Sequence, residues 1–67
     1  MKQFYEKVGL NIAKKRIEKG YSRETLAELT DISPRFLYEI ETGRKGFSAE
    51  VYYKIVQALD VGDLQLL

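Results

Sequence analysis

Polar side chains between residues 34 and 42 are the ones whose types and spacing point to binding chemistry. Arg35 could pair its planar guanidinium with O6 and N7 of a guanine, or could form only a solvated pair with Glu39, four residues on. Glu39 could accept a hydrogen bond from cytosine N4, or could only orient Arg35. Tyr38 could contact a phosphate or a thymine methyl group, or could lean exposed on its own helix. Which alternative holds depends on the element that carries these residues.

The composition excludes several kinds of active site. The chain has no Cys and no His, which removes disulfides, thiolate nucleophiles, the usual zinc sites and histidine acid–base catalysis. It also lacks a glycine-rich phosphate loop and a pair of carboxylates in an evident cleft. We therefore expect no catalytic residue, no metal and no cofactor, and we do not expect an enzyme.

Length and charge describe a small domain with an uneven charge distribution. The 67 residues suffice for one domain, and 45% apolar with 31% charged residues is typical of a compact chain. The net charge of +1 divides into +4 for residues 1–21, −3 for residues 22–42 and 0 for residues 43–67. No apolar stretch approaches the roughly 18 residues of a membrane span, and residues 1–6 do not form a signal peptide. We expect a cytoplasmic protein without membrane contact.

Apolar periodicity and capping residues predict five helices joined by tight turns. Serines at positions 22, 33 and 48 are suitable N-caps, and Pro34 suits the first position of a helix because its missing N–H is not needed there. Gly20 and Gly43 are suitable helix ends, whereas Gly9 weakens the N-terminal half of the first helix. The predicted helices are residues 1–19, 22–30, 33–42, 48–59 and 62–67.

The expected core follows from the same periodicity. In the first helix the apolar stripe comprises Phe4, Val8, Ile12, Ala13 and Ile17. The later helices contribute Leu26, Ala27 and Leu29, then Leu37 and Ile40, then Val51, Ile55, Ala58 and Leu59.

The third predicted helix has two different faces. At about 100° per residue, Leu37, Ile40 and Glu41 group on one side. The opposite side carries Pro34, Arg35, Tyr38, Glu39 and Thr42. Phe36 lies beside Ile40, so we expect it to be half-buried. A helix of this length fits the major groove of DNA, where its N-terminal residues would meet base edges.

The second and third predicted helices, with the three-residue connection between them, form a helix-turn-helix unit at residues 22–42. The surrounding residues resemble the phage-repressor type of helix-turn-helix domain, the Cro/repressor or xenobiotic-response-element family. The matching residues are Arg16, Gly20, Tyr21, Ser22, Leu26, Ala27, Thr30, Ile32, Ser33, Leu37, Ile40, Glu41 and Gly43, followed by Ser48, Ala49, Glu50, Ile55, Ala58, Leu59, Asp60 and Val61.

The resemblance covers about residues 8–67 and implies a fold. We expect an all-α, five-helix, lambda-repressor-like domain over residues 1–67, with residues 33–42 as the recognition helix. The resemblance also implies a partly buried salt bridge between Arg16 and Glu41, which would join the first and third helices.

The resemblance further implies sites for double-stranded DNA. It places base contacts at Pro34, Arg35 and Glu39, and phosphate contacts near Arg23, Thr42 and Arg44, with the loop after the recognition helix following the phosphate backbone. To these we add Tyr38 as a base contact and Ser33 and Lys45 as phosphate contacts. For Pro34 a helix-starting role, and for Arg23, Arg44 and Lys45 simple solvation, are the alternatives.

The residues are compatible with two functions. The first is a sequence-specific, repressor-like transcription regulator that binds two half-sites as a homodimer. Its expected dimer contacts are Val61, Leu64, Leu66 and Leu67, which could instead only cap the core, with Phe4 and Tyr5 as a second candidate seam. The second is a protein-interaction module, antitoxin-like or adaptor-like, that presents Phe36, Tyr38, Tyr52 and Tyr53 to a protein partner.

Overall fold

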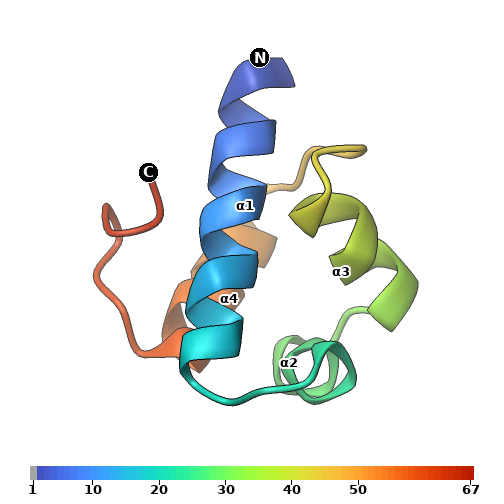
Figure 1. Cartoon of the computed structure of the whole chain (residues 1–67), viewed down its shortest axis with the longest axis vertical. Coiled ribbons are helices and arrows are strands. Elements are labelled where there is room, and N and C mark those ends of the chain that lie inside the picture. The colour runs from blue at the N-terminus through green and yellow to red at the C-terminus, as the bar shows by residue number, and fades with distance from the viewer. Residues whose placement is uncertain (1) are drawn as a thin grey trace.

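Four α-helices form the part of the chain that the structure, a computed structural model, describes, which is residues 2–67. They are α1 (Lys2–Glu18), α2 (Arg23–Thr30), α3 (Pro34–Glu41) and α4 (Ala49–Leu59). The longest helix, α1, runs down the middle of the view in Figure 1, with α2 and α3 on one side and α4 behind it. The C-terminal segment folds back along the other side of α1. None of the helices within residues 2–67 has the length and apolar character needed to cross a bilayer.

Serine side chains start the three shorter helices, as the sequence predicts. The Oγ atoms of Ser22, Ser33 and Ser48 each accept a hydrogen bond from the backbone N–H three residues later, at 3.0, 3.0 and 3.1 Å. Such a cap stabilises a helix by about 1 kcal/mol. Asp31 and Asp60 end α2 and α4 in the left-handed conformation, with φ of 57° and 55°.

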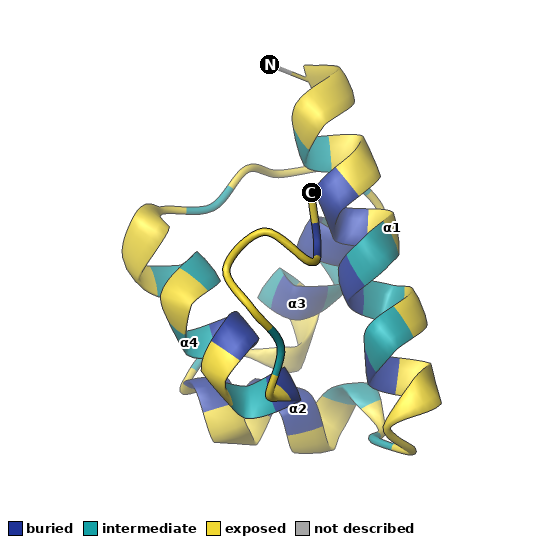
Figure 2. Ribbon diagram, turned by 90° about the vertical axis from the view of Figure 1, so that its left-hand side faces the viewer, coloured by how far each residue is buried: buried dark blue, intermediate teal, exposed yellow. Residues whose placement is uncertain are grey.

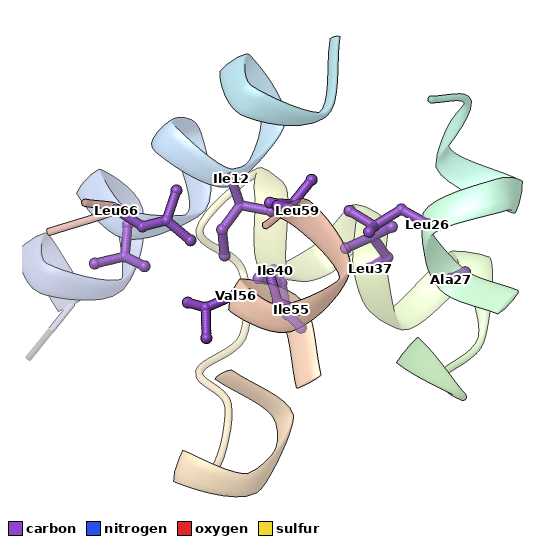
Figure 3. Packing of buried hydrophobic residues seen from close by; sticks show 10 residues of the cluster. Ile12, Leu26, Ala27, Leu37, Ile40, Ile55, Val56, Leu59 and Leu66 are labelled. Carbon is purple, nitrogen blue, oxygen red and sulfur yellow. The ribbon is translucent and has the colours of Figure 1, made fainter. Parts of the chain in front are cut away.

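One hydrophobic core lies where the four helices and the C-terminal segment meet, and nine of its members are labelled in Figure 3. Three side chains predicted to face inward are instead exposed: Phe4, Ile17 and Leu29. On α1 the inward line runs through Val8, Ile12 and Arg16, so Ile17 lies about 100° away from it and is 66% exposed. Val56 is buried although the apolar periodicity did not place it in the predicted core.

Gly9 allows α1 and α3 to cross closely and does not interrupt α1. A Cβ atom at this position would lie 2.0 Å from the carbonyl oxygen of Ile40, which is backbone and cannot rotate away. The helix propensity lost at Gly9 is therefore offset by the close packing of α1 on α3.

The predicted fifth helix is absent, and residues 62–67 form two successive turns. Their hydrogen bonds span three residues, from Gln65 N to Gly62 O and from Leu67 N to Leu64 O. The carbonyl of Asp63, which an α-helix would pair with Leu67 N, accepts a hydrogen bond from the Tyr52 hydroxyl at 2.6 Å instead. A helix of six residues has too few hydrogen bonds to offset the free-energy cost of its nucleation. The hydrogen bond from Tyr52 therefore determines the conformation of this segment.

The C-terminal segment covers one end of the core. Leu66 inserts between the helices and is 2% exposed, and its carbonyl oxygen accepts a hydrogen bond from Asn11 Nδ2 at 2.8 Å. Leu64 is 77% exposed, Leu67 is also exposed, and Val61 is half-buried. In Figure 2 this segment lies over the space between α1 and α4. Leu66 therefore belongs to the core, and Leu64 and Leu67 remain available for contact with another molecule.

Candidate nucleic-acid interface

The α2–α3 unit has the compact arrangement of a helix-turn-helix. Asp31 turns the chain after α2, and Ile32 N donates to Ala27 O at 3.1 Å, so α3 starts at Pro34 after a short connection. The two helices pack on each other and lie side by side in Figure 1. The inner face of α3 is buried, including Leu37, Ile40 and Glu41, as the periodicity predicts. The opposite face carries the exposed Pro34, Arg35 and Thr42, whereas Tyr38 and Glu39 on the same face are half-buried.

The N-terminal half of this outer face presents Pro34 and Arg35. Pro34 is exposed at the first position of α3, and the Arg35 side chain is 76% exposed. The Glu39 carboxylate is largely covered, with Arg35 Nε at 3.5 Å and Lys45 Nζ at 3.4 Å. In the free protein Glu39 thus orients two cations, one on its own helix and one in the following loop.

A buried ion network lies directly beneath the outer face. Arg16 Nε donates to Glu41 Oε2 at 2.7 Å and Arg16 Nη2 donates to Glu41 Oε1 at 3.2 Å, so the ion pair implied by the resemblance is present and bidentate. Arg16 Nη1 also donates to the backbone oxygen of Tyr21 at 2.9 Å. The Glu41 side chain is only 2% exposed, and no buried side-chain polar atom among residues 2–67 lacks a partner.

Arg23 joins this network from α2, a contact that the sequence did not predict. Its Nε donates to Glu41 Oε1 at 3.0 Å, while the side chain remains partly exposed. A guanidinium has five N–H donors, so this bond fixes Arg23 and leaves further donors for a ligand. Sequence spacing gave no signal for the contact, because 18 residues separate Arg23 from Glu41.

The ring of Tyr38 is surrounded by three guanidinium groups. The Cζ atoms of Arg23, Arg35 and Arg44 lie 5.4, 6.0 and 5.7 Å from its centroid, within the range of cation–π contacts. The three arginines come from α2, from α3 and from the loop after α3. We call Tyr38 with these three residues the arginine cluster.

The remaining predicted phosphate contacts border this cluster. Ser33 is exposed as the N-cap of α3, and its oxygen accepts the Phe36 N–H, which leaves its hydroxyl proton free to donate. Thr42 Oγ1 donates to the Tyr38 carbonyl at 2.8 Å in the free protein. The backbone N–H groups of Arg44 and Lys45 both bond to the Glu39 carbonyl, at 2.8 and 3.3 Å, which holds the loop against the end of α3.

The negative charge of residues 22–42 does not describe this surface. Two of the five acidic residues in that range, Glu39 and Glu41, are already paired with arginine or lysine. Folding also brings Arg16, Arg44 and Lys45 to this surface from outside that range, so the two carboxylates lie among five cations. This arrangement can bind a polyanion, and no group of residues among 2–67 could hold a metal ion through three His, Cys, Asp or Glu side chains.

An apolar hollow of about 200 Å³ lies in a different part of the molecule. Its lining includes Phe4, Tyr5, Phe47, Tyr52 and Leu67. The rings of Tyr5 and Phe47 meet edge to face, with centroids 5.0 Å apart, and Phe47 stacks on Tyr52. This surface joins the start of α1, the loop before α4 and the C-terminus, and it carries no part of the arginine cluster.

Comparisons with known proteins give the same fold and family. The helix-turn-helix family pattern matches residues 12–66. The uncharacterized HTH-type transcriptional regulator y4dJ of Sinorhizobium fredii is 33% identical over 60 residues, which are 90% of this chain and 78% of that protein.

Two solved structures are also similar. The restriction-modification controller protein C.AhdI from Aeromonas hydrophila superimposes with a TM-score of 0.92 and 29% identity, covering 97% of this chain and 98% of that one. The clp gene regulator ClgR from Corynebacterium glutamicum gives a TM-score of 0.90 and 32% identity, covering 92% of this chain and 66% of that one. The sequence match extends over most of the chain, and the structural match includes the α2–α3 unit. This chain belongs to the helix-turn-helix family of the Cro and repressor type, whose members are DNA-binding transcription regulators.

Proposed function

We propose that this chain is a sequence-specific, repressor-like transcription regulator that binds a two-fold symmetric operator in double-stranded DNA as a homodimer. The observation that carries the proposal is the outer face of α3, where the side chains of Arg23, Arg35, Arg44 and Lys45 gather and the carboxylates of Glu39 and Glu41 hold three of them in place. The regulators to which the chain is similar support the same function. The protein acts by binding, in the cytoplasm, and not by catalysis.

In this proposal α3 enters the major groove with its N-terminus towards the bases. Arg35 is the principal reader, because its exposed guanidinium can bind guanine O6 and N7 together. Pro34, Tyr38 and Glu39 line the same groove-facing side. The phosphate contacts come from Arg23, Ser33, Thr42, Arg44 and Lys45.

A dimer is proposed because one copy of α3 is too short to contact more than a small part of a DNA site. Its eight residues span about 12 Å, which covers only a few base pairs. Two copies could read half-sites about 34 Å apart on one side of the duplex. The exposed Leu64 and Leu67 are the proposed contacts between copies, with Val61 at the edge of this surface.

The test is selection of binders from a random pool of double-stranded DNA at moderate salt, carried out in parallel with the wild type and with Arg35→Ala. A two-fold symmetric site from the wild type, with preference lost at one base position of each half-site in the variant, is the expected result. Removal of one bidentate contact should cost about 1–3 kcal/mol of discrimination at that position.

An unselective wild type that binds DNA only at low salt would contradict the proposal. The alternative would then be a protein-interaction module, for which the apolar hollow beside Phe4 and Tyr52 is the specific supporting observation. Contact with an apolar protein surface should change little between low and moderate salt, whereas phosphate contacts should weaken steeply.

A further inference from the structure

We propose that Tyr38 is the positioning residue of the DNA interface: its ring gathers Arg23, Arg35 and Arg44 from three elements into one preformed site for the phosphate backbone and the adjacent base edge. The inference rests on the proposed function and deepens it. A single aromatic side chain would then set both the phosphate contacts of Arg23 and Arg44 and the base contact of Arg35.

Geometry is the first support for this role. The three Cζ atoms lie between 5.4 and 6.0 Å from the Tyr38 centroid, although the arginines are far apart in the sequence. Three like charges close together repel one another, so some group must offset their repulsion. The Glu41 and Glu39 carboxylates offset part of it at Arg23 and Arg35, and the negative face of the Tyr38 ring offsets more without cancelling any charge of the cluster.

The three arginines of the cluster differ in whether a carboxylate also binds them. Arg23 has the buried Glu41 carboxylate at 3.0 Å, and Arg35 has Glu39 at 3.5 Å. For Arg44 there is no carboxylate within ion-pair distance among residues 2–67, so the Tyr38 ring is the partner that its guanidinium has there. Loss of the ring should therefore release Arg44 most, Arg35 less and Arg23 least.

The backbone that carries Tyr38 is also held in place. Tyr38 is half-buried on α3, and its backbone oxygen accepts both the Thr42 N–H and the Thr42 hydroxyl, at 3.0 and 2.8 Å. Long arginine side chains lose rotamer freedom when they bind, and a ring that already holds them lowers that cost. Preorganisation of this kind strengthens binding, and without the ring Arg44, which has no carboxylate to hold it, should lose its phosphate contact.

A second role for Tyr38 can be separated from this one by a conservative variant. If its hydroxyl donated a hydrogen bond to a phosphate, Tyr38→Phe would weaken binding as much as Tyr38→Leu. If the ring face is what matters, Tyr38→Phe keeps the cluster and only Tyr38→Leu releases it. The chain has no Trp, so Tyr38→Trp adds a ring with a stronger cation–π face and a unique fluorescent reporter.

The experiment measures the affinity of these three variants and the wild type for the selected operator at several salt concentrations. Tyr38→Leu should bind about 10-fold more weakly at low salt, and the slope of log K against log salt should become shallower by about 1. Tyr38→Phe and Tyr38→Trp should keep the wild-type slope. Because Arg44 depends most on the ring, Arg44→Ala should cost less in the Tyr38→Leu background than in the wild type.

A readout in the free protein tests the cluster without DNA. The Cδ protons of the three arginines should be shifted upfield in NMR spectra of the wild type and Tyr38→Phe by the ring current, and should return towards ordinary values in Tyr38→Leu. Urea unfolding of each variant shows whether the fold is kept.

Two results would overturn this inference while leaving the proposed function in place. One is a wild type that binds DNA with the same salt slope as Tyr38→Leu, and the other is an equal loss of DNA affinity in Tyr38→Phe and Tyr38→Leu. A wild type that binds no DNA would overturn the proposed function as well.

Discussion

Arg23 Nε donates a hydrogen bond to Glu41 Oε1 at 3.0 Å, and this bond connects the exposed start of α2 to an ion pair buried between α1 and α3. The same carboxylate thus supports the packing of α3 on α1 and the orientation of a surface arginine. Stability and binding are therefore linked at Glu41, and substitutions there should change both.

The Glu41 network predicts unequal effects of its members on stability. Glu41→Ala leaves Arg16 buried without its carboxylate and should lower the free energy of unfolding by about 3–5 kcal/mol. Arg16→Ala should cost less, because Arg23 still pairs with Glu41. Urea unfolding at pH 7 measures both variants and the double variant.

The double variant provides the internal control for this network. With Arg16 and Glu41 both replaced, the remaining Arg23 can turn to solvent, so the combined loss should be smaller than the sum of the two single losses. Strictly additive losses would show that the ion pair contributes no coupling between α1 and α3.

Arg44→Ala should weaken binding to every DNA sequence about equally. Its guanidinium lies beside the outer face of α3 but is proposed to contact phosphates and not bases. The slope of log K against log salt should become shallower by about 1. Titrations of the operator and of a scrambled duplex at several salt concentrations measure this, with Arg35→Ala as the contrasting variant. A changed base preference in Arg44→Ala would contradict the assignment.

Gly9→Ala should destabilise the protein although Ala is the better helix former by about 1 kcal/mol. The added Cβ would meet the Ile40 carbonyl oxygen at 2.0 Å and would force α1 and α3 apart, at a cost of about 1–3 kcal/mol after relaxation. Thermal unfolding measures the effect as a lower Tm.

The matched control is Gly62→Ala in the C-terminal segment. There the added Cβ would meet the Gln65 side chain at 3.6 Å, an ordinary contact, so its Tm should stay within a few degrees of the wild type. Similar Tm values for the two variants would show that the crossing of α1 and α3 tolerates a wider separation.

The raised pKa of the Tyr52 hydroxyl leads us to expect a change in the stability of the protein at high pH. Burial raises the pKa of this hydroxyl, and the nearby Asp63 carboxylate adds to the rise. The folded state therefore favours the neutral phenol, which donates to the Asp63 backbone oxygen. A pKa raised on folding contributes stability below the unfolded pKa, near 10, and this stability is lost as pH rises through the folded pKa.

Unfolding of the wild type and Tyr52→Phe at several pH values tests this. The variant should be less stable by about 1 kcal/mol near pH 7, because it lacks the hydrogen bond. The difference should shrink or reverse above pH 10 as the wild-type phenol ionises. A difference that stays constant with pH would mean that Tyr52 titrates alike in the folded and unfolded states.

Substitutions at Leu64 and Leu66 should have opposite effects on dimer formation and on monomer stability, because Leu64 is exposed and Leu66 is buried. Leu64→Ser changes an exposed side chain, so it should leave monomer stability nearly unchanged but weaken the proposed dimer. Leu66→Ala removes a core side chain and should lower the free energy of unfolding by about 2–5 kcal/mol. Sedimentation equilibrium and urea unfolding distinguish these effects. A wild type that is monomeric at high concentration would remove Leu64 and Leu67 as dimer contacts.

Local sequence signals were sufficient for most of the helices. The three serine caps and the inner face of α3 lie where spacing predicts them, because capping and helical periodicity involve residues three or four positions apart. The prediction was wrong for residues 62–67, where the Tyr52 hydroxyl takes the backbone carbonyl of Asp63. That competition comes from a residue eleven positions away, and no local pattern contains it.

The candidate site divides in the same way. The sequence alone determined an all-helical domain, the start of α3 at Pro34, the outward position of Arg35 and, through a family resemblance, the Arg16–Glu41 pair. Only the tertiary structure decided that Glu41 also holds Arg23 and that three arginines surround the Tyr38 ring. The reason is physical: an arginine side chain is long and can reach many positions, so its partner depends on how α1, α2 and α3 pack in space. The net charge of residues 22–42 does not describe this surface, because folding brings Arg16, Arg44 and Lys45 to it from outside that range.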